Sequence, residues 1–479
     1  MKYTILIFIL FTSLNLDSQN INWEMGMNIA NNSYGNMHPR MAIDRAGNPL
    51  IIWGKMSDES VYFSRWNSTS FTTPIKLNPT GFTVANASWM GPDIASLGDT
   101  VYVVFKRSPE NKSENNIFII SSFDGGKNFS APIRVDFIQD SLSRFPTVTI
   151  DSKGNPIVAF MKFNSKFLES RWVVTKSTDM GKTFAVDTKA SGYSGADAEV
   201  CDCCPGAIVA TEKNTVLLYR DNYKNIRDIW AAISDNACQS FDTGFHADNT
   251  NWMITSCPST GPDGIIIGDT LYSVYMSGGS KVFRNYLSKS TLSNSMVATV
   301  TNLGNNIMGL SQQNYPRIAT DGKAAAIVWR QNVDGVSQLP ILFTPNITSG
   351  FSSNYEIVDI GDNSNCDVEM ANGKIYVAWQ DDNSGTIKYR KGSYNISNIS
   401  SELSEQSILI TPNPTSDFVN IQCELNSEIR LINLIGETLQ TVKSSQEIIK
   451  LDLLNLDKGI YILEIRNQEK IFTQKLMKQ

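Results

Sequence analysis

The segment PTVTIDSKGNPIVAF, residues 146–160, contains the pattern that decides the fold. A strand opens beside a proline, turns at Gly, Asn or Asp, and continues as an apolar strand that ends in an aromatic residue. Gly, Asn and Asp tolerate the positive φ angles that tight hairpin turns require. The segment is therefore predicted to form a β-hairpin.

Six further copies of this pattern make the chain a repeat protein. They are PRMAIDRAGNPLIIW (39–53), PDIASLGDTVYVVF (92–105), PGAIVATEKNTVLLY (205–219), PDGIIIGDTLYSVY (262–275), PRIATDGKAAAIVW (316–329) and CDVEMANGKIYVAW (366–379). The aromatic residues that end the seven copies are Trp53, Phe105, Phe160, Tyr219, Tyr275, Trp329 and Trp379, spaced 50 to 59 residues apart. Most copies lead into a third alternating strand, such as RWVVTKS (171–177).

Four-stranded units of about 50 residues that are arranged radially form a β-propeller, which typically has four to eight blades. The predicted fold class is therefore all-β: a propeller, with seven blades favoured and six possible, followed by a small C-terminal β-sandwich. The alternatives are a β-solenoid or tandem sandwiches. The stretch INWEMGMNI (21–29) precedes the first copy and is predicted to complete the blade that contains Trp379, which would close the ring without an open edge.

The two ends of the chain differ from the repeats. Residues 1–19 have the features of a secretory signal peptide, with Lys2 followed by an apolar run and then small and polar residues. That run is too short to span a bilayer, which takes about 20 residues, and no later segment is apolar enough, so no transmembrane segment is expected in the mature protein. The propeller is expected from 20 to 394, a polar linker from 395 to 407, and the sandwich of alternating strands from 408 to 479.

Composition limits the classes of partner. The formal net charge is −6, which argues against nucleic acid as a partner, because phosphate binding needs a basic face. The chain has only two histidines, which argues against a His-rich metal site and against a mechanism that needs two histidines. No cofactor is expected.

Two segments resemble the Asp-box of sialidases and related propellers, Ser-x-Asp-x-Gly-x-x-aromatic. They are SFDGGKNF, with Ser122, Asp124, Gly126 and Phe129, and STDMGKTF, with Ser177, Asp179, Gly181 and Phe184. Degenerate copies are SRWNSTSF from Ser64 and SDNACQSF from Ser234. The motif is structural: an Asx-type turn satisfies local N–H groups, the glycine takes the strained position, and the aromatic packs between blades.

A third stretch also resembles bacterial sialidase-like propellers. It runs from Glu199 to Pro262 and contains AEVCDCCPGAIVA, then Tyr-Arg-Asp, Ile-Arg-Asp and a later Cys-Pro. Known sialidases hold the substrate carboxylate with three arginines and use a tyrosine–glutamate pair as nucleophile and an aspartate as acid/base. This chain lacks the Arg-Ile-Pro segment that usually supplies the first arginine, although HPRMAID places Arg40 nearby. No residue can be assigned as catalytic.

The C-terminal segment resembles the type A sorting domain of type IX secretion. The resemblance rests on Pro412-Asn413-Pro414, Gly436, the stretch with Leu456, Gly459 and Tyr461, and the terminal Lys475-Leu476-x-Lys478. It implies a host among the Bacteroidetes, the type IX secretion machinery as a partner, and a protein that is secreted or held on the outer cell surface.

The seven cysteines leave their chemistry open. In an exported chain they favour disulfides. The disulfide or metal candidates are Cys201, Cys203, Cys204, Cys238 and Cys257, whereas Cys366 and Cys423 stand apart. One interpretation is that the stretch forms one or two disulfides, such as a bond to Cys257 or Cys238. A thiolate metal site is the other, although the spacing matches no standard zinc pattern.

Strand ends supply the candidate ligand-binding residues. In each hairpin the start of the first strand and the end of the second lie at one end of the blade, where a propeller is concave. The residues at these ends are Arg40, Glu199, Arg220, Asp221, Arg227, Arg317 and Arg330. They are expected to surround one mouth of the axial channel and to make it locally positive, which suits an anionic glycan. Arg220 is expected to be exposed there.

Two functions of different classes follow from the resemblance. The first is an extracellular propeller that binds a glycan or glycoprotein, or acts as a scaffold, without catalysis. The second is an exo-acting glycoside hydrolase of sialidase type. The missing Arg-Ile-Pro favours the first. The segment Tyr219-Arg220-Asp221 and the arginines near the axis keep the second open.

Overall fold

The seven repeated hairpins form the first two strands of seven separate antiparallel sheets. The computed structural model describes residues 21–30, 34–136, 141–195, 197–394, 410–423, 425–434, 436–446, 448–466 and 471–479. The predicted signal peptide and the predicted linker lie outside these residues. The chain divides into two compact units, residues 1–396 and 397–479. No helix in the described ranges is long and apolar enough to cross a membrane.

Each sheet of unit 1 is one blade, and the blades are numbered in chain order from the first hairpin. Blade 1 contains β3 (Asn36–Ile43), β4 (Pro49–Lys55), β5 (Ser60–Arg65) and β6 (Ile75–Lys76). Blade 2 contains β7 (Asp93–Leu97), β8 (Thr100–Lys106), β9 (Ile117–Ser122) and β10 (Ile133–Arg134). Blade 3 contains β11 (Ser141–Ile150), β12 (Pro156–Asn164), β13 (Arg171–Lys176) and β14 (Thr188–Lys189).

The remaining four blades follow the same plan, with two variations. Blade 4 contains β15 (Glu199–Val200), β16 (Ala207–Ala210), β17 (Thr215–Asn222), β18 (Ile229–Ser234) and β19 (Thr243–His246). Blade 5 contains β20 (Asp263–Ile267), β21 (Thr270–Ser277), β22 (Arg284–Thr291) and β23 (Met296–Asn302). Blade 6 contains β24 (Leu310–Thr320), β25 (Ala325–Val333), β26 (Val336–Thr344) and β27 (Glu356–Ile360). Blade 7 contains β28 (Asn363–Ala371), β29 (Lys374–Asp381) and β30 (Thr386–Ser393), together with β1 (Asn22–Trp23) and β2 (Met27–Asn28).

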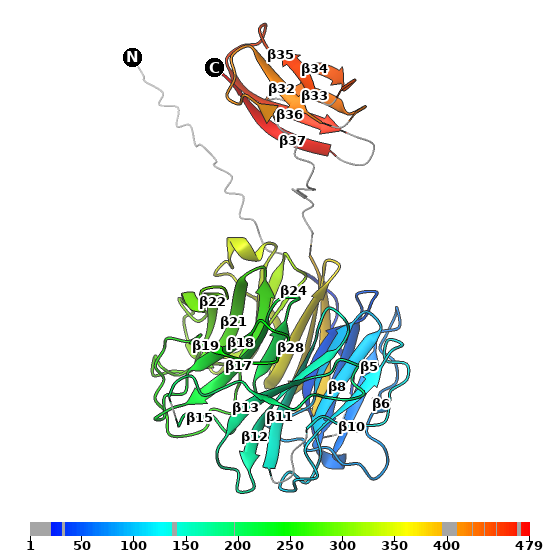
Figure 1. The fold of residues 1–479 in the computed structure, drawn as a ribbon, viewed down its shortest axis with the longest axis vertical. Helices are drawn as coiled ribbons and strands as arrows, with labels where there is room; N and C mark the ends of the chain where they lie inside the picture. Colours follow the sequence, from blue (N-terminus) through cyan, green and yellow to red (C-terminus); the bar gives the residue numbers. More distant parts are fainter. Residues whose placement is uncertain are drawn as a thin grey trace, which may run out of the picture. The chain divides into compact units, whose positions relative to one another are not determined.

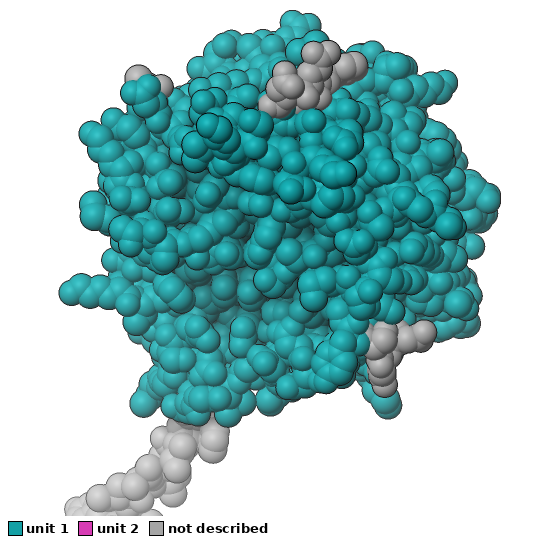
Figure 2. All heavy atoms as spheres, turned by 90° about the horizontal axis from the view of Figure 1, so that it is seen from below, with its two compact units in different colours: residues 1–396 teal, residues 397–479 magenta. Residues whose placement is uncertain are grey.

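The first strands of the blades form a closed ring. Each contacts the first strand of the next blade, in the order β3, β7, β11, β16, β20, β24 and β28, and β28 in turn contacts β3. In Figure 1 the blades follow one another from blue through cyan and green to yellow, and Figure 2 shows unit 1 from below as one rounded body. The propeller prediction, with seven blades, is therefore confirmed.

The two ends of unit 1 meet in blade 7. β1 and β2 both pair antiparallel with β30, with Asn22 opposite Ser393 and Met27 opposite Tyr389. The indole N–H of Trp23 also donates to the Glu356 carboxylate of blade 6 at 2.9 Å. The N-terminal segment thus completes the blade that contains Trp379, as predicted.

The core of unit 1 lies between neighbouring blades. The seven aromatic residues that end the repeats are at most 2% exposed. Each packs in a layer shared by two blades; Phe160 of blade 3, for example, packs in one cluster with Tyr102 and Val104 of blade 2. The alternating apolar residues of the second strands are therefore buried on both faces, which explains their high hydrophobicity.

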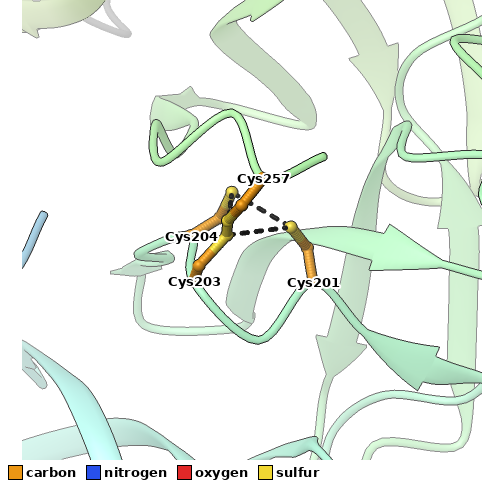
Figure 3. Close-up of side chains that lie close together, drawn as sticks. All are labelled: Cys201, Cys203, Cys204 and Cys257. Carbon is orange, nitrogen blue, oxygen red and sulfur yellow. Dashed lines mark hydrogen bonds between the residues drawn. A yellow bond between two sulfur atoms is a disulfide. The ribbon is translucent and has the colours of Figure 1, made fainter. Parts of the chain in front are cut away.

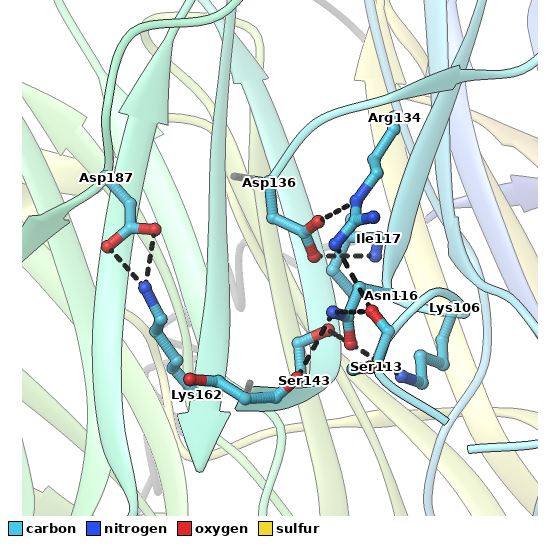
Figure 4. A network of polar contacts seen from close by, with 10 residues as sticks. Lys106, Ser113, Asn116, Ile117, Arg134, Asp136, Ser143, Lys162 and Asp187 are labelled. Carbon is cyan, nitrogen blue, oxygen red and sulfur yellow. Dashed lines mark hydrogen bonds and ion pairs between the residues drawn. The ribbon is translucent and has the colours of Figure 1, made fainter. Parts of the chain in front are cut away.

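Polar contacts also join blades, as Figure 4 shows for blades 2 and 3. The side-chain carbonyl of Asn116, before β9, accepts hydrogen bonds from the Lys106 ammonium at 3.1 Å and from the Ser143 hydroxyl of β11 at 2.9 Å. Burial lowers the pKa of Lys106 to about 8. The interface between these blades therefore contains hydrogen-bonded polar groups as well as apolar side chains.

Unit 2 consists of two antiparallel sheets around one apolar core. One contains β31 (Ile410–Thr411), β32 (Phe418–Gln422) and β35 (Ile448–Asp452), and the other β34 (Thr438–Lys443), β33 (Glu428–Ile432), β36 (Gly459–Arg466) and β37 (Ile471–Lys478). Side chains from both sheets, including Val419, Ile421, Leu431, Leu463 and Leu476, are fully buried in one cluster. This is the expected small β-sandwich.

Candidate functional site

A cavity of about 150 Å³ is lined by residues that lie in, or just before, the first strands of all seven blades. We call it the axial cavity. The lining residues with polar or charged side chains are His38, Arg40, Asp93, Thr147, Ser259, Thr260, Asp263, Tyr315, Arg317, Asn365, Cys366 and Glu369. Several lie within two residues of the proline that opens a repeat, so the motif that builds each hairpin also places side chains at the axis.

Bulges shape the rim of the axial cavity in four blades. The strand register shifts between residues 37 and 40, 144 and 147, 314 and 317, and 364 and 367. Inside each shift, one non-glycine residue has a positive φ: His38, Phe145, Tyr315 and Asn365. Left-handed backbone at such residues is uncommon and clusters at functional sites. Each of these four residues lines the cavity.

Three aspartates link neighbouring blades around the axial cavity. Asp93 accepts the backbone N–H of Val148 at 3.0 Å, and Asp263 accepts that of Ile318 at 2.9 Å. Asp367 accepts the backbone N–H of Met41 at 2.7 Å, which joins blade 7 to blade 1. In each case a carboxylate from one blade holds the first strand of the next.

Arg317 is fixed by two of these aspartates. Its Nε lies 2.8 Å from Asp367, and its NH1 lies 3.4 Å from Asp263. Burial disfavours the charged guanidinium, but the two carboxylates outweigh burial and raise the pKa of Arg317. Arg317 is therefore a structural cation whose charge is already compensated.

Arg40 differs from Arg317. Its NH1 donates to the carbonyl of Pro39 at 2.7 Å, and it forms no ion pair with any residue that the structure describes. Burial, followed by the positive charge of Arg317, lowers the pKa of Arg40. Its guanidinium is therefore a charged group at the cavity with unused capacity for an anion.

Glu369 lines the same cavity and tends toward the neutral form. Burial, followed by the negative charge of Asp367, raises the pKa of its carboxyl well above the usual range. Burial also raises the pKa of Asp263, although Arg317 opposes this shift. Burial at the axial cavity thus shifts the carboxyls of both Glu369 and Asp263 toward the protonated form.

The structure brings only Arg40 and Arg317 of the predicted ligand-binding residues to the axial cavity. Glu199 is exposed and accepts the backbone N–H of Glu169 at 2.9 Å. Arg330 pairs with Asp362 at 2.9 Å, outside the lining.

Arg220, Asp221 and Arg227 are buried within blade 4. Arg220 is fully buried, and its guanidinium donates to the carbonyls of Thr260, Arg227 and Met276. Its expected exposure is therefore wrong, because backbone carbonyls take the place of solvent. The expected positive mouth stays a prediction, since Arg40 and Arg317 share the cavity with the carboxyl groups of Asp93, Asp263 and Glu369.

Sequence reasoning missed the acidic residues in and beside the cavity. Asp93, Asp263 and Asp367 occupy the position directly after the first residue of their repeats, where other copies have Arg40 and Arg317. Aligning the seven copies at this position would have found them. Glu369 follows two residues later on the same strand face.

The cysteine stretch interrupts the first strand of blade 4. Residues 201–206 separate β15 from β16, although both strands pair with β17. The Sγ atoms of Cys201 and Cys204 lie 3.2 Å apart, and those of Cys201 and Cys203 lie 3.6 Å apart. Cys203 and Cys257 are joined by a disulfide (Figure 3). Cys238 lies elsewhere in the blade, with its thiol 3.5 Å from the Thr215 hydroxyl.

The Cys201 thiol has an unusual environment. A hydrogen bond from the Cys204 thiol, together with the charges of Arg220 and Arg227, lowers the pKa of Cys201 to about 7 despite burial. The Arg227 guanidinium donates to its sulfur at 2.9 Å. This sulfur therefore carries negative charge readily.

The two Asp-box segments form matching turns. Ser122 donates to Asp124 at 2.8 Å, and its oxygen accepts the N–H of Gly126 at 2.9 Å. Ser177 donates to Asp179 at 2.8 Å and accepts the N–H of Gly181 at the same distance. The degenerate segment from Ser234 has the same bonds, to Asn236 and from the N–H of Cys238, which takes the positive φ of the glycine.

The motifs of unit 2 meet around its last strand. The Asn413 side chain donates to the Lys475 carbonyl at 2.7 Å and accepts the Met477 N–H at 2.9 Å. The buried Lys478 ammonium donates to the carbonyls of Leu453, Leu454 and Leu456. The first and last motifs are thus joined by hydrogen bonds, which makes the end of the chain part of the fold.

A comparison with protein families agrees with the bounds of unit 2. Residues 409–479 match the family described as "Secretion system C-terminal sorting domain". No curated protein matches the chain. Similar solved structures include a Dyadobacter fermentans protein of unknown function, with 10% identity over 65% of this chain and 95% of that one, and a TM-score of 0.45.

Two glycosidases are also among the similar structures. A Hadza microbial sialidase has 11% identity over 77% of this chain and 68% of its own, with a TM-score of 0.47. A Fusarium graminearum α-L-arabinofuranosidase has 12% identity over 69% and 99%, with a TM-score of 0.46. The propeller assignment rests on the seven sheets and their closed ring. The chain is therefore a seven-bladed β-propeller that carries a secretion system C-terminal sorting domain at residues 409–479.

Proposed function

We propose that this protein is exported by type IX secretion and binds the acidic end of a glycan in its axial cavity. The observation that supports this proposal is the state of Arg40. A partly buried guanidinium without an ion pair gains most from a ligand carboxylate, because the two groups form a charge-assisted, bidentate pair. Arg317 cannot play this part, since Asp263 and Asp367 already hold it.

The volume of the axial cavity favours a terminal sugar over a chain. About 150 Å³ is below the roughly 300–1,000 Å³ of pockets that enclose drug-sized ligands. One ring with its carboxylate is the natural occupant, while the rest of the glycan stays outside. The carboxyl groups of Asp93, Asp263 and Glu369 offer acceptors and donors for the sugar hydroxyls.

The route of export completes the proposal. A signal peptide at residues 1–19 takes the chain across the inner membrane, and the sorting domain, preceded by a linker at 395–407, directs it through the outer membrane. The protein is then secreted or held on the cell surface, where glycans and glycoproteins are available.

Calorimetry with a sialylated oligosaccharide and its uncharged counterpart tests the binding proposal. We expect the wild-type protein to prefer the acidic glycan, and Arg40→Gln to weaken this binding at least tenfold, as for a lost charge-assisted pair. Arg330→Gln is the matched control, because Arg330 lies outside the cavity, and it should bind like the wild type. Equal binding by Arg40→Gln and wild type, or no preference for the acidic glycan, would contradict the proposal.

A second candidate is an exo-acting glycoside hydrolase. Glu369 favours it, because burial and the charge of Asp367 raise the pKa of the Glu369 carboxyl, and glycoside hydrolysis uses a proton-donating carboxyl together with a second carboxyl group. A fluorogenic sialoside assay on the same preparation separates the two functions. Turnover supports the hydrolase, and binding without turnover supports the lectin-like propeller.

A further inference from the structure

Four cysteine sulfurs from two blades converge beside the axial cavity. Cys201, Cys203 and Cys204 lie in the interruption of the first strand of blade 4, and Cys257 lies in the segment that leads into blade 5. All four sulfurs lie within 4.8 Å of one another (Figure 3). We propose that these four cysteines bind one Zn²⁺ ion as a tetrathiolate site.

Three of the six sulfur–sulfur distances are close to those of a tetrahedral ion, whereas Cys203 and Cys257 form a disulfide that must be reduced before an ion binds. Two disulfides require only two short sulfur pairs, whereas a tetrahedral ion requires every pair to be close. With Zn–S bonds of about 2.3 Å, the sulfurs of a tetrahedral site lie about 3.8 Å apart. The Cys201–Cys203 and Cys203–Cys204 sulfur distances are 3.6 and 3.9 Å, and the Cys201–Cys204 distance is 3.2 Å.

The charges around the cluster provide a second, independent argument. Arg220 and Arg227 are both buried, and neither forms an ion pair with a carboxylate in the part of the chain that the structure describes. A buried cation is costly without a counter-charge, and the carboxylate that interacts with Arg220, Asp248, forms no ion pair with it. Four thiolates around a divalent cation carry a net charge of about −2 by simple addition of unit charges, which balances these two guanidinium groups.

Arg227 also has the position of an outer-shell partner. Its NH1 donates to the Cys201 sulfur at 2.9 Å, and its Nε donates to the Ile254 carbonyl at 3.2 Å. Hydrogen bonds to ligand atoms orient metal ligands and stabilise their charge. The same side chain therefore holds both the cysteine stretch and the segment that carries Cys257.

Hydrogen bonds and a close backbone contact hold together the two segments that carry the four cysteines. The N–H of Cys201 donates to the Arg220 carbonyl at 3.0 Å, and Arg220 in turn donates to the Thr260 carbonyl at 3.3 Å. Gly261 approaches Pro205 so closely that an added Cβ would lie 2.1 Å from the Pro205 carbonyl oxygen. Since Pro205, Thr260 and Gly261 line the axial cavity, an ion at the cluster fixes its rim between blades 4 and 5.

Zinc binding and disulfide formation compete for the same thiols. Four thiols take up one Zn²⁺ and release four protons, with no change in oxidation state. Oxidation of Cys203 and Cys257 instead removes two electrons and two protons and gives the disulfide of Figure 3. The two outcomes exclude each other, because the disulfide removes two of the four ligands.

Metal analysis of the full-length chain, purified under anaerobic conditions without chelator, tests the site. We expect about one Zn²⁺ per chain, as for a closed structural site. Exchange for Co²⁺ should produce the strong visible bands and thiolate charge-transfer absorption of a tetrahedral sulfur site. After unfolding with a chelator, all seven cysteines of the zinc form should react with an alkylating agent. In the disulfide form, only five cysteines would react.

Serine variants assign the ligands. Cys201→Ser, Cys204→Ser and Cys257→Ser should each lower zinc content and abolish the Co²⁺ spectrum. Cys238→Ser, a buried cysteine of the same blade outside the cluster, should keep both. The wild-type measurement decides the matter even if variants fail to fold: a fully reduced protein that takes up neither Zn²⁺ nor Co²⁺ overturns the proposal.

Discussion

His38 shows how one buried side chain couples the axial cavity to pH. Its Nε2 lies 2.6 Å from the Ala87 carbonyl, so this nitrogen carries the proton and donates it. Burial, followed by the positive charge of Arg40, lowers the pKa of His38 to about 3. In the unfolded chain the pKa of a histidine is about 6.5. The unfolded state therefore binds a proton between these values that the folded state does not.

The expected consequence is a loss of stability in acid. As the pH falls from about 6.5 toward 3, the free energy of unfolding should drop, and by pH 4.5 His38 alone should account for about 2–3 kcal/mol. His38→Gln retains a donor for Ala87 but does not titrate. Denaturant unfolding of both proteins from pH 7.5 to 4.5 measures the difference. Parallel curves for the two proteins would show that His38 does not set this dependence.

Individual side chains were the hardest feature to predict from the sequence. Arg220 follows a buried aromatic at the end of a strand, and nothing in the sequence distinguishes an exposed end from one covered by a neighbouring segment. The covering carbonyls come from residues 227, 260 and 276, which the fold alone brings together. Arg40 and Arg317 were found because their position repeats.

At the scale of strands, the sequence predicts those strands that have an apolar pattern and are joined by a recognisable turn. The first two strands of every blade were found, because each is apolar and is joined by a turn of Gly, Asn or Asp. The fourth strands β6, β10 and β14 have only two residues each and lack such a pattern. The division of the first strand of blade 4 into β15 and β16 was also missed, because cysteine and proline give no strand signal there.

The last strand of unit 2 gives a prediction at this scale. The Lys478 ammonium is buried and satisfies three backbone carbonyls. Lys478→Met keeps the length of the side chain but removes these hydrogen bonds, and should destabilise unit 2 by about 2–4 kcal/mol. Lys475→Met on the exposed side of β37 is the matched control and should have little effect. Calorimetry of the full chain measures the midpoint of the unfolding transition of unit 2. Equal midpoints for the two variants would contradict the role assigned to Lys478.

For the whole molecule, the two units have separate cores and different tasks. Unit 1 closes on its own ends, and unit 2 has its own apolar cluster. Deletion of residues 408–479 should therefore leave a propeller whose thermal midpoint stays within about 2 °C of that in the full chain. The truncated protein should accumulate in the periplasm, because its sorting domain is gone.

Cell fractionation and surface labelling measure this outcome. Refusion of residues 408–479 to the truncated propeller is the control and should restore export. Surface exposure of the truncated protein equal to that of the full chain would show that another segment directs export.

The pairing of β1 and β2 with β30 has a kinetic consequence. Chain ends are usually where a fold frays first, but here each end of the propeller holds the other; the Arg390 side chain, for example, donates to the Glu24 carbonyl, 366 residues away along the chain. The ring cannot close until its last blade has been synthesised, so assembly is slow. In the closed ring, the first and last strands are paired with each other, so unfolding must begin by breaking this pairing. We therefore expect the ring to open at blade 7. The rate of this opening should set the half-life of the protein in the presence of proteases.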